Sequence, residues 1–185
     1  MTGSAVENLH AGTQGCTIAP VLETDRLVLR PPRAEDKDAY VAFFLSDRAR
    51  YVGRAASRYH AWKTFAMEAG HWALHGFGPW VVTRRGDDRA LGTVGCWHPD
   101  GFPERELGWV IFDGEGQGFA HEAAIAARAY DYEQFATRTL VSYIDPGNAR
   151  SVRLAERLGA VVDRNAVGPD PGDLVYRHPG PEALS

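Results

Sequence analysis

The chain has 185 residues, which is the size of one domain. It is 44% hydrophobic and 24% charged, a globular composition that excludes intrinsic disorder. The formal net charge of −4 argues against binding nucleic acid or an anionic membrane through overall charge. Two cysteines exclude a disulfide scaffold and a CxxC site. The sequence shows no long apolar run and no signal peptide, so we expect a cytoplasmic protein.

Hydrophobic spacing and turn residues predict the elements in chain order. We expect strands at 26–30, 80–83, 90–97, 104–112, 139–144, 161–162 and 174–176, and helices at 34–45, 60–74, 119–135 and from 148 to the glycine at 159. This order predicts one mixed α/β domain over 21–178, with about seven mostly antiparallel strands, about four helices and one β-α-β crossover. Residues 1–20 are predicted to be a flexible arm and 179–185 a tail.

Several side chains have ordinary structural interpretations. In the 60–74 helix we expect Trp62, Phe65, Ala66, Ala69 and Ala73 to share one face. The core or a pocket wall is the expected place for the aromatic residues and one histidine, namely Trp62, Phe77, Trp80, Trp97, His98 and Trp109. Cys96 reads as a small buried residue. His71 and His75 have metal-ligand spacing but no further ligand nearby, so we expect surface or partly buried histidines and no metal.

A glycine-rich loop, Asp113-Gly114-Glu115-Gly116-Gln117-Gly118, joins a predicted strand to a predicted helix. Three glycines in five positions let backbone N–H groups converge, and a helix N-terminus follows, so the place suits a pyrophosphate. It is not a P-loop, because no Gly-Lys-Ser/Thr follows, and it lacks the third small residue of the dinucleotide fingerprint. An ordinary tight turn predicts the same spacing.

Around this loop the sequence resembles a known family. Glu106-Leu107-Gly108-Trp109-Val110-Ile111, followed by Gly116-Gln117-Gly118-Phe119-Ala120-His121-Glu122-Ala123-Ala124, looks like the acetyl-CoA site of the GNAT superfamily of N-acetyltransferases. Three further segments, at 23–31, 144–151 and 154–160, resemble its RimJ/RimL-like branch, the ribosomal-protein-alanine acetyltransferase type. The resemblance covers about residues 21–178. It implies a GNAT-type fold whose central parallel strands, those of Glu106 and Thr139, splay apart to admit acyl-CoA.

The resemblance further implies acetyl-CoA as cosubstrate, no metal, and direct attack by a primary amine in a ternary complex. The acceptor is a protein N-terminus or a small-molecule amine. The residues implied to bind the cofactor are Gly108, Trp109, Val110, Glu115, Gly116, Gln117, Gly118, Phe119, Ala120, Asn148 and Ser151. Glu115 stands where the superfamily often has Gln or Arg, and an acid beside a pyrophosphate is unfavourable unless it points away.

Two residues are candidates for catalysis. Strand alternation puts Glu106 on one face with Gly108 and Val110, where its carboxylate can accept the amine's proton. The alternative for Glu106 is a solvated strand end or a salt bridge to Arg105 or Arg84. The resemblance implies that Ser151 protonates the leaving thiolate.

Other interpretations remain open at this stage. The family resemblance implies that Asn148 binds the pantetheine arm, but Asn148 and Ser151 are also favoured as helix-capping residues. A non-catalytic acyl-CoA sensor on the same fold, or a nucleotide-binding protein, is the alternative function. The sequence leaves open whether the chain forms a homodimer.

Overall fold

The computed structural model describes residues 19–184. The predicted arm therefore lies outside the described residues except at its end, where Ala19 is buried and the Pro20 carbonyl accepts a hydrogen bond from Trp80 Nε1 at 2.8 Å. The strands are β1 (Leu22–Glu23), β2 (Leu27–Arg30), β3 (Pro79–Arg84), β4 (Asp87–Trp97), β5 (Glu106–Ile111), β6 (Val141–Ile144), β7 (Val161–Val162) and β8 (Leu174–Arg177). The helices are α1 (Lys37–Phe44), α2 (Arg58–His75), α3 (Phe119–Phe135) and α4 (Ala149–Arg157), with 3-10 turns at Ala34–Asp36, Asp47–Ala49 and Pro181–Ala183.

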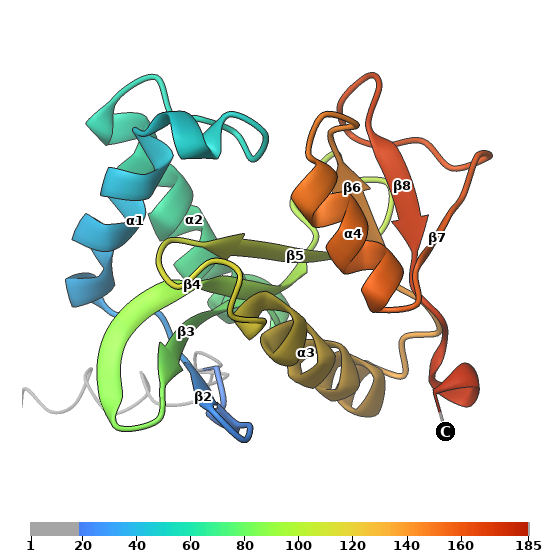
Figure 1. Ribbon diagram of the computed structural model, residues 1–185, viewed down its shortest axis with the longest axis horizontal. Helices are drawn as coiled ribbons and strands as arrows, with labels where there is room; N and C mark the ends of the chain where they lie inside the picture. Colours follow the sequence, from blue (N-terminus) through green and yellow to red (C-terminus); the bar gives the residue numbers. More distant parts are fainter. Residues whose placement is uncertain (1–18, 185) are drawn as a thin grey trace, which may run out of the picture.

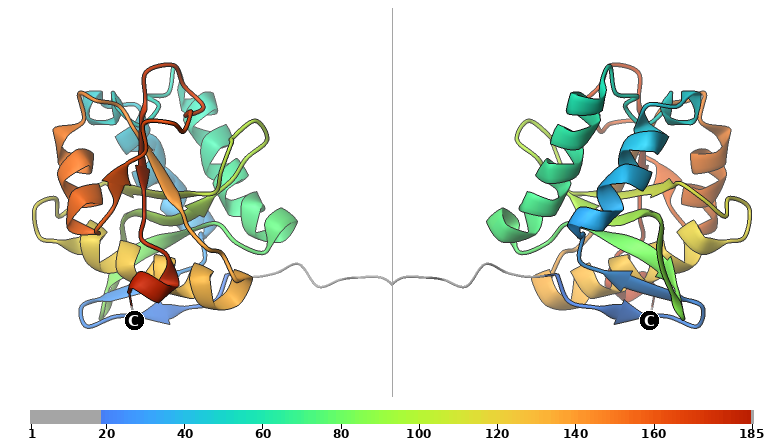
Figure 2. Two further views of the ribbon diagram at one scale, coloured as in Figure 1. Left: turned by 90° about the vertical axis from the view of Figure 1, so that its right-hand side faces the viewer. Right: turned by 90° about the vertical axis from the view of Figure 1, so that its left-hand side faces the viewer.

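The strands form one sheet in the order β1-β2-β3-β4-β5-β6-β8-β7, in which only β5 and β6 pair in parallel. The predicted mixed α/β fold is thereby confirmed, with the short strand β1 added. α3 packs on one face of the sheet and α1 and α2 lie on the other, while α4 lies beside β6 and β8 (Figures 1 and 2). α3 begins and ends at the predicted residues.

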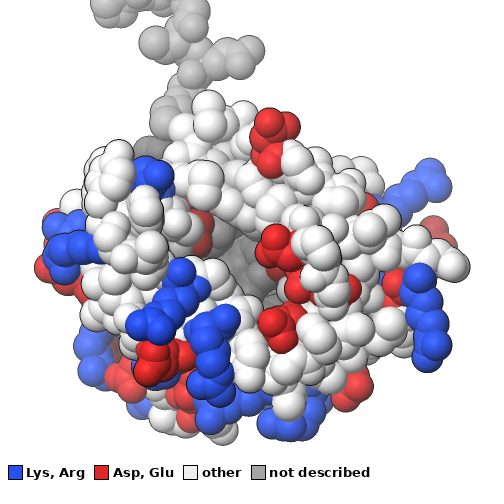
Figure 3. Space-filling model, turned by 90° about the horizontal axis from the view of Figure 1, so that it is seen from above, with Lys and Arg blue, Asp and Glu red and all other residues white. Residues whose placement is uncertain are grey.

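The centre of the sheet opens between β5 and β6. These strands share a single pair of opposite residues, Glu106 and Val141, and the Val141 N–H donates to the Arg105 carbonyl at 3.2 Å. Beyond this point β6 continues beside β8, with which it pairs over four residues. The predicted splay of the parallel pair is present, and it opens a cleft of about 650 Å³, visible as the central hollow in Figure 3.

The prediction of which face of α2 is buried was wrong. The buried residues of this helix are Ala61, Phe65, His71 and Trp72, whereas Trp62 is 46% exposed and stacks on Tyr59 at the surface. Two sets of apolar residues, one that starts at position 61 and one that starts at position 62, both have helical spacing. Only the set that starts at position 61 packs against the rest of the protein. Cys96 is buried, as predicted.

Candidate active site

The glycine-rich loop between β5 and α3 takes a backbone that favours glycine. Gly114, Gly116 and Gly118 have φ values of 76°, 82° and 83°, and Gly118 is the N-cap of α3. A Cβ added at Gly116 would meet nothing within 4 Å, so open space lies beside the loop there. The first N–H groups of a helix lack intrahelical partners and attract anions. The loop therefore combines backbone donors with room for a phosphate group.

Two arginines hold the loop from the side of β2 and β3. Arg26 Nη1 donates to the Gln117 carbonyl at 3.0 Å, and Arg84 Nη2 donates to Gln117 Oε1 at 2.7 Å. Both guanidinium groups lie over the Phe119 ring, at 5.1 and 4.9 Å from its centroid. The Gln117 side chain and the Phe119 ring thus fix the loop. The Gln117 carbonyl and N–H are engaged by Arg26 and by the Gly114 carbonyl, so the first N–H groups of α3 are the ones that can serve a ligand.

The segment before β2 clamps the start of α3. Glu122, in the first turn of α3, accepts hydrogen bonds from Thr24 Oγ1 at 2.6 Å and from Arg26 Nε at 2.6 Å. These bonds, together with the N–H of Arg26, outweigh partial burial and lower the pKa of Glu122. The Thr24-Asp25-Arg26 stretch noted in the sequence therefore positions the helix that follows the glycine loop.

Glu115 is neutralised by two arginines. Its carboxylate accepts from Arg48 Nη2 at 2.9 Å and from Arg150 Nη1 at 2.6 Å. Partial burial opposes ionisation, but these hydrogen bonds outweigh it and lower the pKa of Glu115. Arg48 also donates to the Phe112 carbonyl at 2.7 Å. The acid in the loop is thus paired, and two guanidinium groups stand next to the loop.

Glu106 lies half-buried at the point where β5 and β6 separate, and it lines the cleft. A Cβ on Gly108 would lie 3.9 Å from its carboxyl group, which confirms that the two residues share a face. Burial raises the pKa of Glu106 from about 4.5 to about 8, with help from the charges of Asp173 and Glu68 and partly offset by the Tyr143 N–H.

The expected alternative of a salt bridge for Glu106 is wrong. Arg105 pairs instead with Asp131 at 2.8 Å, and Arg84 binds Gln117. The alternative of a solvated strand end is wrong as well, because Glu106 is half-buried inside the cleft. A carboxyl group without a cationic partner, sheltered in a cleft and with a pKa near neutrality, is suited to proton transfer.

Asn148 and Ser151 line the same cleft. Asn148 Oδ1 accepts from the Ser151 N–H at 3.2 Å, so the predicted N-cap is confirmed. The Ser151 hydroxyl has a different neighbour, since its oxygen accepts from Trp109 Nε1 at 3.2 Å. Because the Ser151 hydroxyl accepts this hydrogen bond, its own proton remains available for donation to a ligand.

A buried chain of hydrogen bonds fastens the strands near the opening. The Ser142 hydroxyl donates to the Leu107 carbonyl at 2.6 Å, His178 Nε2 lies 3.0 Å from Ser142 Oγ, and Arg128 Nη1 lies 3.3 Å from His178 Nδ1. Arginine only donates, so Nδ1 accepts and Nε2–H donates to Ser142. Burial, with Arg128 adding to it, lowers the pKa of His178 to about 3. The nitrogen that faces Ser142 therefore already carries a proton, and the ring is too weak a base to take another, which excludes a Ser-His nucleophile here.

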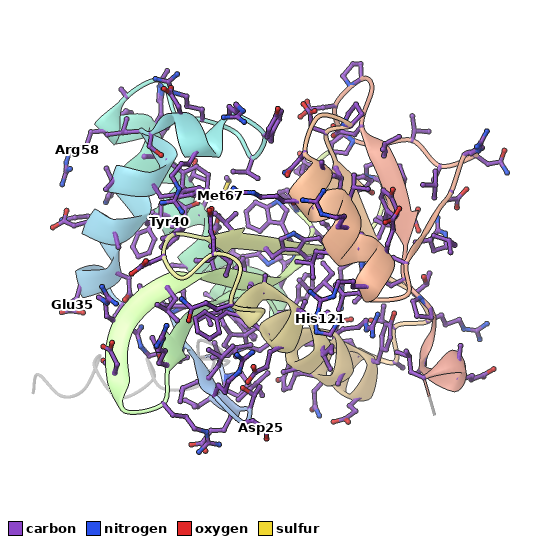
Figure 4. The ribbon with its side chains drawn as sticks, viewed as in Figure 1. Asp25, Glu35, Tyr40, Arg58, Met67 and His121 are labelled. Carbon is purple, nitrogen blue, oxygen red and sulfur yellow. The ribbon has the colours of Figure 1, made fainter. Side chains whose placement is uncertain are left out.

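The cleft is lined by more acids than the sequence indicated. Besides Glu106 they are Glu68, Asp145, Asp170 and Asp173, and they come from α2, from the turn after β6 and from the segment before β8. Tyr40 of α1, which is labelled in Figure 4, donates a hydrogen bond to Glu68, and burial raises the pKa of Glu68 to about 7. Glu68 lies on the same face of α2 as the buried residues Phe65 and Trp72. A carboxylate at such a position in the sequence could have indicated that it belongs to the site.

The histidine pair of α2 is part of the packing. His71 is buried, His75 is exposed, and their rings stack with centroids 4.2 Å apart. The His71 ring bonds to the Phe77 carbonyl at 2.7 Å and accepts from the His98 N–H at 3.2 Å, and burial lowers its pKa. Within residues 19–184, no group of three His, Cys, Asp or Glu side chains is arranged to hold a metal ion.

The site combines a splayed pair of parallel strands with a glycine loop at a helix N-terminus, an arrangement that suits proteins that use acyl-CoA. Comparison with known proteins identifies the family. Residues 26–161 match the family described as Acetyltransferase (GNAT) domain. The chain belongs to the GNAT acetyltransferase family, which transfers acetyl groups from acetyl-CoA. Within the described part of the chain, no helix has the length and apolar character needed to span a membrane.

Solved structures agree with this assignment. An acetyltransferase from Agrobacterium tumefaciens is 39% identical with a TM-score of 0.82, over 86% of this chain and 94% of that one. A GnaT-family acetyltransferase from Bordetella pertussis is 27% identical with a TM-score of 0.72, over 86% and 99%. The aminoglycoside acetyltransferase AAC(6')-Ib, solved with coenzyme A, shares the fold at 16% identity and a TM-score of 0.70, over 85% and 96%.

Proposed function

We propose that this protein is an N-acetyltransferase that transfers the acetyl group of acetyl-CoA to a primary amine by direct attack in a ternary complex. The observation that carries the proposal is the placement of Glu106. Its carboxyl group stands without a cationic partner at the point where β5 and β6 separate, inside the cleft, and its pKa is about 8. An amine must lose a proton to react, and this carboxylate is positioned to take it.

The chain offers places for each part of acetyl-CoA. The backbone of the loop from Glu115 to Ala120, at the N-terminus of α3, would hold the pyrophosphate. Gly108, Trp109 and Val110 on β5 face the gap left by β6, where backbone groups of a splayed strand are free to bind the pantetheine arm. Asn148 would add its side-chain amide, which lines the same cleft.

The reaction then needs two proton transfers. The Glu106 carboxylate takes a proton from the acceptor amine, whose nitrogen attacks the thioester carbon and forms the new amide bond. The C–S bond breaks, and the thiolate receives a proton from the Ser151 hydroxyl, whose oxygen is held by Trp109. Proton exchange with water returns both side chains to their starting states. The products are the acetylated amine and coenzyme A.

A screen of small amines and N-terminal peptides, with detection of the released thiol, tests this function. Turnover in wild type and its loss in Glu106→Gln, with acetyl-CoA binding retained, supports the proposal. A protein that binds acetyl-CoA but acetylates no amine is instead a non-catalytic sensor. The RimJ/RimL-like branch and the cytoplasmic location stay predictions from the sequence.

A further inference from the structure

Arg105 is a cation directly beside the proposed base in the sequence, yet it does not pair with it. Successive side chains along a strand point to opposite faces of the sheet, so Glu106 lines the cleft while Arg105 lies on the face that α3 covers (Figure 1). On that face Arg105 Nη1 donates to Asp131 Oδ2 of α3 at 2.8 Å and to Thr137 Oγ1 at 3.3 Å. The guanidinium group also lies 3.7 Å from the centroid of the Phe77 ring. These contacts hold the cation away from the cleft.

Asp131 is the more deeply buried partner of this ion pair. Its side chain is 2% exposed, against 23% for that of Arg105. In the part of the chain that the structure describes, Asp131 Oδ1 is the one buried side-chain nitrogen or oxygen atom without a hydrogen-bond partner. The nearby Cys96 thiol of β4 stays neutral, because burial and the charge of Asp131 raise its pKa. Since an unpartnered buried oxygen costs stability, what Asp131 contributes is its charge beside the guanidinium group.

Arg105 also stands at the vertex of the splayed strands. Its carbonyl accepts the N–H of Val141 at 3.2 Å, and the next residue, Glu106, forms with Val141 the single opposite pair of β5 and β6. The Arg105 side chain therefore anchors to α3 the point from which the Glu106 carboxyl group enters the cleft. A change in the partner of Arg105 acts directly on the neighbouring carboxyl group.

Other groups surround Glu106 inside the cleft. The titratable or charged side chains that line the cleft with it are Arg50, Tyr51, Glu68, Tyr143, Asp145, Asp170 and Asp173. Of these, Glu68 and Asp173 act on Glu106 with negative charge. The Arg50 guanidinium group lies over the ring of Tyr51, 4.7 Å from its centroid. Arg105 is the cation whose charge a carboxylate on the opposite face of β5 compensates.

We propose that Asp131 is a positioning residue of the reaction, which holds the Arg105 guanidinium on the α3 face of the sheet and so keeps this cation from acting on Glu106. The inference rests on the proposed function and adds a residue that does not line the cleft. Without the charge of Asp131, the positive charge of Arg105 would stabilise the Glu106 carboxylate from behind the strand. A carboxylate stabilised in this way is a weaker base toward the amine.

The test measures the pH dependence of kcat/KM with an amine that the screen identifies as an acceptor. Asp131→Asn should lower the inflection, expected near pH 8 in the wild type, by about one pH unit, because an unpaired charge about 10 Å away at an effective dielectric constant of about 20 has this effect. Arg105→Met/Asp131→Asn removes both charges and should return the inflection to near pH 8. The control Asp36→Asn breaks the buried Arg30–Asp36 pair, whose side chains are 4% and 5% exposed, and should lower stability without moving the inflection.

Carbon-13 NMR of protein labelled at the glutamate carboxyl carbons follows the Glu106 proton without turnover. The Glu106 signal is the one that Glu106→Gln removes. Its titration midpoint should fall by about one pH unit in Asp131→Asn and return in the double variant. Thermal melts show which variants fold, and Asp131→Ala, with the same expected shift, replaces Asp131→Asn if that variant is unfolded.

The two measurements separate the possible failures. An unchanged midpoint in the folded single variant, or an equal shift in the single and double variants, overturns this inference but leaves the proposed function. Absence of wild-type turnover with every amine and peptide overturns the proposed function, and with it the role of Asp131 in a reaction. The NMR midpoints distinguish this second outcome from the first.

Discussion

Replacing Glu106 with glutamine should change how the stability of the fold depends on pH. The folded protein holds the proton of Glu106 up to about pH 8, whereas an unfolded chain releases it near pH 4.5. As pH rises through this window, the folded state binds more protons than the unfolded state, so the free energy of unfolding of the wild type falls. Above about pH 8 the loss is complete. Glutamine keeps the shape of the side chain and does not titrate.

The raised pKa corresponds to about 5 kcal/mol for a fully sheltered carboxyl group. Glu106 is half-buried and faces a cleft that water enters, so about 2–3 kcal/mol is expected. Glu106→Gln should therefore match the wild type near pH 4.5 and exceed its free energy of unfolding by this amount above about pH 8. Urea unfolding followed by tryptophan fluorescence at several pH values measures the difference. Glu133→Gln, on the exposed part of α3, is the control. A difference that stays constant with pH would refute the assigned pKa.

Three further predictions concern the loop, α4 and the buried chain. Gly118→Val should weaken coenzyme A binding at least tenfold, about 1.4 kcal/mol. The control Gly86→Val imposes the same backbone strain on the β3–β4 turn and should leave binding unchanged. Equal affinities of the two folded variants would argue against the loop as a phosphate site. Asn148→Ala should raise the KM for acetyl-CoA, and Ser151→Ala should lower kcat about tenfold. If thermal melts show lower stability while steady-state kinetics stay unchanged, both residues are helix caps only. His178→Phe should cost about 1–3 kcal/mol of unfolding free energy at pH 8 and about 0.8 kcal/mol less at pH 6, because His178 takes up a proton near pH 6.5 only in the unfolded wild type; a cost that does not change with pH would contradict a neutral histidine in the fold.

Local sequence patterns predicted the parts of the fold whose causes are local. α3 was predicted at its observed bounds because an apolar helical repeat follows Gly118, and the capping position of Asn148 was read from residue type alone. The order of the elements predicted the β-α-β crossover that makes β5 and β6 parallel, and the family resemblance implied that the two strands splay apart. The α2 face was misassigned because two neighbouring stripes have equal spacing, and only packing against α1 and the sheet distinguishes them.

The parts of the site that the sequence did not reveal depend on contacts between distant segments. Glu68 and Asp173 are 105 positions apart and reach Glu106 only through the arrangement of α2 and β8 around the cleft. The partners of Glu115 come from the turn before α2 and from α4, so its neutralisation has no local signal. Ser142 and His178 likewise meet only because β6 and β8 are neighbours in the sheet.

The pH dependence of kcat/KM for Glu106→Gln beside the wild type tests the central claim most directly, using an amine that the screen identifies as an acceptor. The wild-type value should rise with pH and level off near pH 8, where the Glu106 carboxylate forms. Glu106→Gln should be slower by about 10²-fold, should lack this inflection and should bind acetyl-CoA as the wild type does. A variant that keeps both the rate and the inflection would show that another group, or water, removes the amine's proton.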